Sequence, residues 1–258
     1  MKIFVCIKQV PDTETKIQLK ADKSGIEETG IKWVLNPYDE FAVEEALKVK
    51  EANAGATVTA VSVGPKTRVV DALRTALAMG ADDAVVVDAP ESLDPLATAQ
   101  ALARAIKKEG EPTYVFTGKL AIDDNSAAVG QMTAEFLGVP HVTVVSKLAY
   151  EAGKVTAERE IEGGAREIFA VQTPCLLAAN KGLNTPRYAS LPGIMKAKKK
   201  PVKELTLADV DLSPASSKVK FKNFEMPKDK PAVKMLSGDA AAQAKELVQL
   251  LMNEAKVL

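Results

Sequence analysis

The sequence has little of several residue types that carry chemistry. Its 258 residues include two cysteines, one histidine and one tryptophan, and aromatic residues make up only 5%. Cys6 and Cys175 stand far apart inside apolar runs, so neither metal-ligand spacing nor a disulfide framework is indicated. His141 follows Pro140 at the start of a β-like run, where we expect a structural role. We therefore expect neither a metal site nor an enzyme.

Net charge and long hydrophobic runs are also lacking. Lys plus Arg and Asp plus Glu both number 34, so no global field would attract nucleic acid or an anionic membrane. No apolar run approaches the roughly 18 to 20 residues that span a bilayer. A strand pattern begins at Ile3, so we expect no signal or transit segment and a reduced, bacterial cytoplasmic compartment.

The first 140 residues alternate short Val-rich runs with longer segments of helical spacing, a pattern typical of βαβ units. Asn36-Pro37, Gly64-Pro65 and Asp94-Pro95 each place a capping residue before a proline, which predicts helix starts. The expected strands are 2–7, 57–63, 84–88 and 113–117, and the expected helices include 37–53 and 67–79.

Other segments depart from this pattern. Residues 12–35 separate the first strand from the first helix and predict a hairpin or excursion. Three β-like runs, 142–150, 153–161 and 166–178, have no helix between them and predict an antiparallel addition to the sheet.

The C-terminal part lacks helical periodicity over 201–236, which contains Pro201, Pro214, Pro227 and Pro231, and has an apolar helical stripe over 239–256. A short isolated helix is marginal in water. This helix must therefore cover either its own domain or a partner, and the residues leave both open.

The expected fold class is α/β: a largely parallel nucleotide-binding sheet with flanking helices, an antiparallel addition, and an extended C-terminal arm ending in a helix. We expect an α/β domain over 1–200 and an arm over 201–258 that covers either this domain or a partner.

Ligands of open parallel sheets bind beyond the carboxyl ends of the strands, which points to residues 8–11, 64–67 and 118–128. The last segment leads into a helix start of small residues, whose backbone N–H groups can hold a phosphate. Asn125 and Ser126 can also simply cap that helix, and this is the commoner role of such residues. Neither a G-x-G-x-x-G motif nor a P-loop is present to decide between the two.

A basic segment spans residues 168–203, which contain no Asp or Glu. Residues 190–195, Ser-Leu-Pro-Gly-Ile-Met, predict a loop with apolar side chains beside a lysine cluster, an arrangement suited to docking an acidic partner. The alternative is an ordinary solvated face whose apolar residues pack into their own domain. No aromatic residues alternate with the lysines, which disfavours nucleic-acid binding.

Four segments resemble the electron transfer flavoprotein beta subunit family: RTALAMGAD at 74–82, AIDD at 121–124, GQMTA at 130–134, and LNTPRYASLPGIMKAKKK at 183–200. The motif Asn36-Pro37-Tyr38-Asp39 and the segment 158–164 belong to the same resemblance, which extends from Met1 to about Lys203.

The resemblance implies a non-enzymatic electron carrier. The beta subunit would bind AMP structurally and form a heterodimer with an alpha subunit that carries FAD. The complex would pass electrons from acyl-CoA dehydrogenase-like donors of fatty acid β-oxidation to a quinone reductase, without nucleic acid or membrane insertion.

The resemblance also implies roles for individual residues. The AMP site would comprise Cys6, Asn36, Pro37, Tyr38, Asp39, Val63, Thr117, Gly118, Lys119, Leu120, Ala121, Ile122, Asp123, Asp124, Asn125, Ser126, Ala127 and Ala128. The docking loop 187–200 would use Leu191, Ile194, Met195, Lys196, Lys198, Lys199 and Lys200. Glu160 would contact the flavin domain.

Two alternatives remain open. The first is a bifurcating branch of the family, which binds a second FAD at this site, typically with glycine where this chain has Asp124, and this difference favours AMP here. In either case Ala127 and Ala128 replace the amide or hydroxyl side chains of many relatives, so a phosphate would contact mainly backbone N–H groups. The second alternative is a stand-alone adenine-nucleotide-binding regulatory protein.

Overall fold

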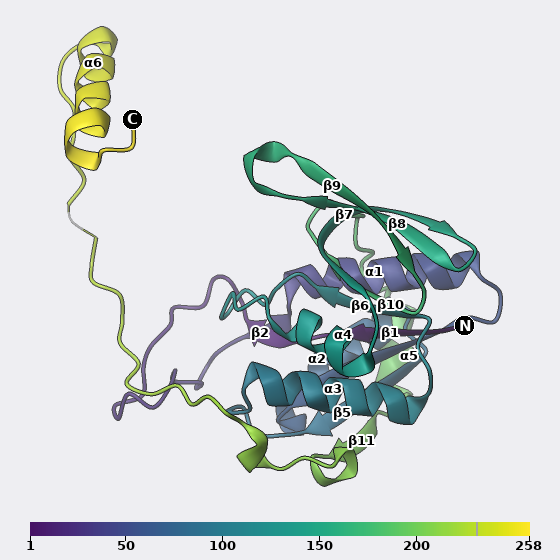
Figure 1. Ribbon diagram of the computed structural model, residues 1–258. Helices are drawn as coiled ribbons and strands as arrows, with labels where there is room; N and C mark the ends of the chain where they lie inside the picture. Colours follow the sequence, from purple (N-terminus) through teal and green to yellow (C-terminus); the bar gives the residue numbers. More distant parts are fainter. Residues whose placement is uncertain (231) are drawn as a thin grey trace.

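The computed structural model of the protein describes residues 1–230 and 232–258. Its centre is a nine-stranded sheet with the order β11-β5-β4-β1-β6-β10-β7-β8-β9 (Figure 1). The parallel part contains β1 (Lys2–Cys6), β4 (Thr57–Gly64), β5 (Asp83–Asp88), β6 (Tyr114–Gly118), β10 (Cys175–Ala179) and β11 (Lys203–Thr206). The sheet ends in β7 (His141–Glu151), β8 (Lys154–Glu160) and β9 (Arg166–Gln172). β7 is parallel to β10, whereas β8 and β9 pair antiparallel.

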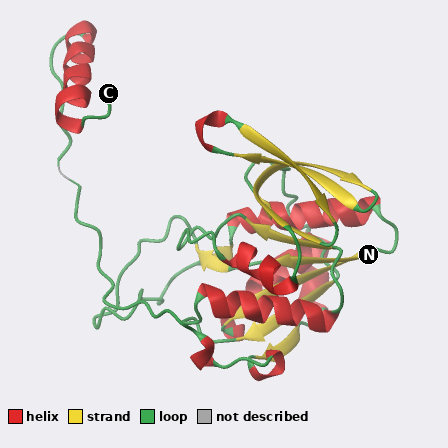
Figure 2. Cartoon of the chain, viewed as in Figure 1, coloured by secondary structure: helices red, strands yellow, loops and turns green. Residues whose placement is uncertain are grey.

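Helices cover both faces of the parallel part. Alternate residues of a strand point to opposite faces, and β1 follows this rule: Ile3 and Val5 pack with α1 (Pro37–Ala52) and α2 (Lys66–Met79). Phe4 and Cys6 pack on the other face with α3 (Pro95–Glu109) and α4 (Val129–Leu137). The layers are therefore helix, sheet and helix, as Figure 2 shows by colour. The α/β class expected from the sequence is confirmed.

The expected strands of the N-terminal part are confirmed as β1, β4, β5 and β6, and the expected helices as α1 and α2, each to within one residue per end. Residues 12–35 form an excursion, closed at its base by β2 (Gln9–Pro11) and β3 (Trp33–Leu35) and further out by a bridge between Leu19 and Ile26. A 3₁₀ turn, η1 (Glu162–Gly164), joins β8 to β9.

The prediction of one strand over 166–178 was wrong. The chain leaves β9 at Thr173-Pro174 and then forms β10, which inserts between β6 and β7 in parallel with both. All five residues of β10 are buried. A continuous apolar run of this kind is typical of a central parallel strand, whereas β9 is mostly exposed.

Residues 190–195 were expected to form a loop, and this prediction was also wrong. They begin α5 (Leu191–Lys199), where the Ser190 hydroxyl accepts the Gly193 N–H at 3.1 Å and Pro192 occupies the first turn. Both residues favour the start of a helix as well as a loop. α5 packs against α2, with Ala197 buried between them.

The arm after β11 contains two 3₁₀ turns, η2 (Ala208–Val210) and η3 (Pro214–Ser216), and ends in α6 (Ala240–Leu250), continued by the π turn η4 (Leu251–Ala255). Figure 1 shows α6 apart from the body at the end of an extended segment. Leu247, Val248 and Met252 are all about half exposed. Pro231, one of the prolines noted in this segment, lies outside the described residues. No helix in the described part of the chain is both long and apolar enough to cross a membrane.

Candidate functional site

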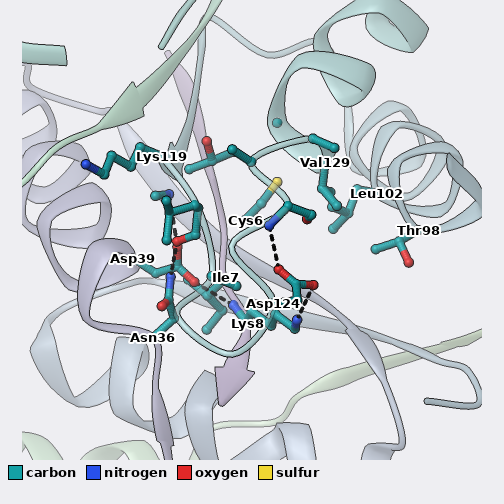
Figure 3. Close-up of a pocket in the computed structure, with 18 of the residues that line it drawn as sticks. Cys6, Ile7, Lys8, Asn36, Asp39, Thr98, Leu102, Lys119, Asp124 and Val129 are labelled. Carbon is teal, nitrogen blue, oxygen red and sulfur yellow. Dashed lines mark hydrogen bonds and ion pairs between the residues drawn. The ribbon is translucent and has the colours of Figure 1, made fainter. Parts of the chain in front are cut away.

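A hollow of about 750 Å³ opens at the carboxyl ends of β1, β4 and β6, between α3 and α4. This volume includes space that is open to solvent. Figure 3 shows Asn36 and Asp39 on one side of the hollow and Thr98 and Leu102 on the other. The lining residues are Cys6, Ile7, Lys8, Asn36, Asp39, Val63, Thr98, Leu102, Thr117, Gly118, Lys119, Leu120, Ala121, Asp124, Ser126, Ala127, Ala128, Val129 and Gly130.

The Asp39 carboxylate joins two strand ends beside the hollow. It accepts the Lys8 N–H at 2.7 Å and the Gly118 N–H at 2.9 Å. A side chain at position 118 would collide with the Asp39 carboxylate, so only glycine permits this approach. Burial raises the pKa of Asp39 to about 7, although the two N–H donors act in the opposite direction.

Asn36 fixes the loop that follows β6. Its side-chain amide donates to the Leu120 carbonyl at 2.9 Å and accepts the Ile122 N–H at 3.2 Å. Asn36 occupies the N-cap position of α1 before Pro37, as expected, but its side chain makes no cap hydrogen bond and serves this loop instead. Gly64 does not cap α2, because Pro65 occupies the N-cap position of that helix. Asp94 caps α3 as expected.

Lys8 holds the same loop through ion pairs. Its ammonium lies 2.8 Å from Asp123 and 3.2 Å from Asp124, and Asp124 also accepts the Ser126 N–H at 3.0 Å. Burial acts to lower the pKa of Lys8, but the two carboxylates outweigh it, so this pKa is raised. Loop 119–126 is therefore tied down by charge at Lys8 and by hydrogen bonds at Asn36.

The first turn of α4 faces the hollow without a side-chain cap. Residues Asn125 and Ala127 adopt left-handed φ values of 52° and 48°, and Ala128 precedes the helix with no side-chain hydrogen bond to it. The alternative that Asn125 or Ser126 caps α4 is therefore contradicted. The first N–H groups of a helix have no acceptor within the helix, and at α4 the N-cap residue Ala128 makes no side-chain hydrogen bond to them.

Thr117 presents an unpaired hydroxyl beside this helix start. The residue is buried, and its Oγ1 atom has no hydrogen-bond partner. Gly130 lies so close that an added Cβ would stand 3.0 Å from this oxygen. Buried polar atoms are normally paired, so this unpaired hydroxyl, whose oxygen exposes less than 1 Å² in the wall of the hollow, departs from the norm directly beside the helix start.

The structure brings most of the predicted nucleotide residues together around the hollow. Exceptions are Pro37, Tyr38, Ile122, Asp123 and Asn125, which do not line it. All of these except Asn125 line a neighbouring hollow with Phe41 and Lys181. Lys119 lies between the two, with its Nζ 4.9 Å from the Tyr38 ring centre.

Burial, then the charge of Asp39, raises the pKa of Cys6 to about 12, so its thiol stays protonated and unreactive.

Five lining residues were not predicted: Ile7, Thr98, Leu102, Val129 and Gly130. Lys8 was indicated by the strand-end rule but was not assigned to the nucleotide. A lysine directly after the first strand was a usable signal for Lys8, because that strand end had been placed at the site. Thr98 and Leu102 belong to α3, whose position over β4 and β5 depends on the sheet order and has no local signal.

The docking segment presents exposed apolar and basic side chains. Leu191 is 75% exposed and Met195 55%, so the alternative that they pack into their own domain is contradicted. Lys196, Lys198 and Lys199 are exposed, whereas the Lys200 ammonium donates to the carbonyls of Ala81 and Asp82 at 2.8 and 2.9 Å.

Arg187 and Glu160 have structural partners of their own. The Arg187 guanidinium pairs with Glu44 at 2.8 Å and with Glu51 at 2.5 Å, which fixes the segment before α5 to α1. Glu160 ends β8, is exposed, and accepts a hydrogen bond from the Asn180 amide at 2.9 Å. Among the described residues, no group of three His, Cys, Asp or Glu side chains can hold a metal ion.

Comparison with known proteins gives consistent matches. A family model described as "Electron transfer flavoprotein domain" matches residues 24–210. The electron transfer flavoprotein subunit beta of Bacillus subtilis is 44% identical over 263 residues, covering 100% of both chains. The mitochondrial subunit beta of Arabidopsis thaliana is 42% identical over 260 residues, again covering 100% of both. The subunit beta of Mus musculus is 42% identical over 253 residues, covering 96% of this chain and 98% of the relative.

Proposed function

Since this chain belongs to the electron transfer flavoprotein family as a beta subunit, we propose that it binds AMP in the hollow beside α4 and serves as the scaffold of an electron-carrying heterodimer. The redox-active FAD belongs to the alpha subunit. This chain supplies no redox group of its own and acts by binding, positioning and docking.

The observation that carries the nucleotide assignment is the unpaired Thr117 hydroxyl next to the uncapped first turn of α4. A phosphate accepts hydrogen bonds from both, and the positive end of the helix dipole favours its charge. Ala127, Ala128 and Gly130 are small enough for a phosphate to approach the backbone. Because Ala127 and Ala128 have no side-chain donor, the phosphate is held here by backbone N–H groups.

The remainder of the hollow fits the rest of AMP. Val63 and Leu102 offer apolar side chains to a base, and the buried Cys6 thiol is unreactive. Asp123 and Asp124 place two negative charges on loop 119–126, and the single ammonium of Lys8 offsets one of them. A second phosphate group near this pair would meet net negative charge, which supports a mononucleotide over the pyrophosphate of a second FAD.

The exposed features of the chain support its role as a docking subunit. We assign Leu191 and Met195 on α5 to contact with acyl-CoA dehydrogenase-like donors, with Lys196, Lys198 and Lys199 steering their approach. Lys200 contributes less to steering, because its charge is engaged by two carbonyls. Glu160 contacts the flavin domain, and the exposed apolar side chains of α6 pack on the alpha subunit.

The assembled complex passes electrons from these donors to a quinone reductase in the bacterial cytoplasm. The test is to mix the purified heterodimer with a reduced acyl-CoA dehydrogenase and record bleaching of the flavin absorbance. We expect stoichiometric reduction of the heterodimer and no reducible chromophore in the full beta chain alone. A beta chain that is itself reduced, or a heterodimer that accepts no electrons, would contradict the carrier role.

A further inference from the structure

The Asp94 carboxylate makes bonds to two parts of the chain at once. One oxygen accepts the Ala97 N–H at 2.8 Å and so caps α3. The other accepts the N–H groups of Lys218 and Val219 at 2.5 and 2.9 Å, and the Asp94 N–H donates to the Ser217 hydroxyl at 3.0 Å. Asp94 is only 3% exposed. A helix cap requires only the first of these bonds, so the remaining three need another explanation.

The residues bound by Asp94 lie where the C-terminal arm leaves α3. Upstream of them, Arg104 donates to the carbonyls of Val210 and Asp211 at 2.8 and 2.7 Å, so α3 holds residues 210–219 near both of its ends. Downstream, the arm touches the excursion where Phe224 donates to the Lys23 carbonyl at 3.1 Å. In the described part of the chain, no hydrogen bond joins residues 226–258 to the body.

Two residues of the same helix form part of the wall of the nucleotide hollow. Thr98 and Leu102 line that hollow, and the Thr98 N–H donates to the Asp94 carbonyl at 2.9 Å. Thr98 thus follows the cap by one turn of the helix. A shift of the first turn of α3 would therefore move the arm anchor and the pocket wall together.

We propose that Asp94 is a positioning residue that fixes where the C-terminal arm leaves the body and couples the arm to the nucleotide site through α3. The inference rests on the proposed nucleotide site but concerns a different set of residues. Filling the hollow holds Thr98 and Leu102 in place, which keeps the α3 cap and hence the arm anchor in place. By thermodynamic linkage, an arm held by the partner subunit must strengthen nucleotide binding by the same factor.

The test uses limited trypsin digestion of the full beta chain with and without saturating AMP. Lys218 in the anchor and Lys220 and Lys222 just beyond it are exposed cleavage sites. We expect AMP to slow their cleavage about 5-fold or more, the lower end of typical coupling between sites. Binding of AMP is measured on the same samples by calorimetry.

Two variants separate the anchor from the cap. Asp94→Ser keeps a good helix cap but removes the acceptor of the two arm N–H groups, and Ser217→Ala leaves the cap untouched while removing one arm contact. Both should speed cleavage without AMP, and Asp94→Ser should abolish protection by AMP while still binding it. Asp239→Ser is the matched control, because Asp239 caps α6 through the Ala242 N–H at 2.8 Å without holding the body.

The outcomes are distinct. Wild-type cleavage that is equally fast with and without bound AMP, or protection that persists in Asp94→Ser, would overturn the coupling and leave the nucleotide site standing. A wild-type chain that binds no AMP in calorimetry would overturn the nucleotide assignment and the coupling together.

Discussion

The carboxylate of Asp39 accepts the N–H of Gly118 at 2.9 Å and thereby joins the first turn of α1 to the carboxyl end of β6. Through its other oxygen, the same carboxylate holds the backbone of Lys8. The floor of the hollow is therefore built around one buried acid, and the stability of the protein should depend on the ionisation of that acid.

We expect the Asp39 carboxyl to make the free energy of unfolding fall as pH rises from about 4 to about 7. Its pKa is about 7 in the folded protein and 3.8 in the reference state, so the unfolded chain loses its proton first. The fall is at most about 4 kcal/mol. Urea unfolding across this range should show it in the wild type and not in Asp39→Asn, whereas Asp209→Asn should retain it. The same slope in Asp39→Asn would contradict the assignment.

Thr117→Val should weaken AMP binding about 10-fold, since one hydrogen bond to a ligand is worth about 1 kcal/mol and more when the acceptor is charged. The substitution keeps the shape of the side chain and leaves no protein group unpaired, because Thr117 Oγ1 has no protein partner. The unfolding midpoint in urea should therefore not fall. Calorimetry that finds unchanged AMP affinity would remove Thr117 from the site.

Lys8→Met should accelerate AMP release, because it frees Asp123 and Asp124 from the ion pairs that hold loop 119–126 over the hollow. The unpaired carboxylates would also repel the phosphate. Stopped-flow displacement of a fluorescent AMP analogue measures the rate. Lys147→Met breaks a comparable exposed pair with Glu158, 2.8 Å long, between β7 and β8 and should leave the rate unchanged.

Leu191→Ala should raise the KM of the complex for its dehydrogenase donors, since loss of a hot-spot side chain at an interface costs about 2 kcal/mol or more. Ile17→Ala removes another exposed apolar side chain, on the excursion, and serves as the control. Nucleotide content should not change in either variant. Equal KM values for Leu191→Ala and wild type would reject this residue as the anchor.

Replacing Lys196, Lys198 and Lys199 together by Gln should lower the association rate with donors and flatten its salt dependence. Lys200→Gln should act mainly on stability, because Lys200 donates to the carbonyls of Ala81 and Asp82. Stopped-flow association at several ionic strengths separates the two effects. A salt-independent wild-type rate would exclude electrostatic steering.

Local patterns were sufficient where short-range rules determine the structure. Apolar runs and proline-marked starts predicted β1, β4, β5, β6, α1 and α2, because each signal lies within the element itself. The carboxyl-end rule for parallel sheets pointed to the segment after β6, and residues of this segment line the hollow. The nucleotide itself was implied only by family resemblance.

Tertiary relationships were beyond local patterns. β10 inserts between β6 and β7 although Pro174 separates it from β9, and nothing near Cys175 specifies those neighbours. Asn36 was expected to cap a helix, but the chain brings Leu120 and Ile122 to it from 84 and 86 residues away. The dual bonding of Asp94 was hidden for the same reason, because Lys218 and Val219 lie more than 120 residues downstream.

The central claim is that this subunit holds a structural mononucleotide while its partner holds the flavin. The most direct measurement is to purify the native heterodimer, denature it, and quantify the released nucleotides by chromatography. The account predicts one AMP and one FAD per heterodimer. Two FAD per heterodimer would contradict it in favour of a bifurcating complex, and the absence of AMP beside one FAD would remove the nucleotide site from this subunit.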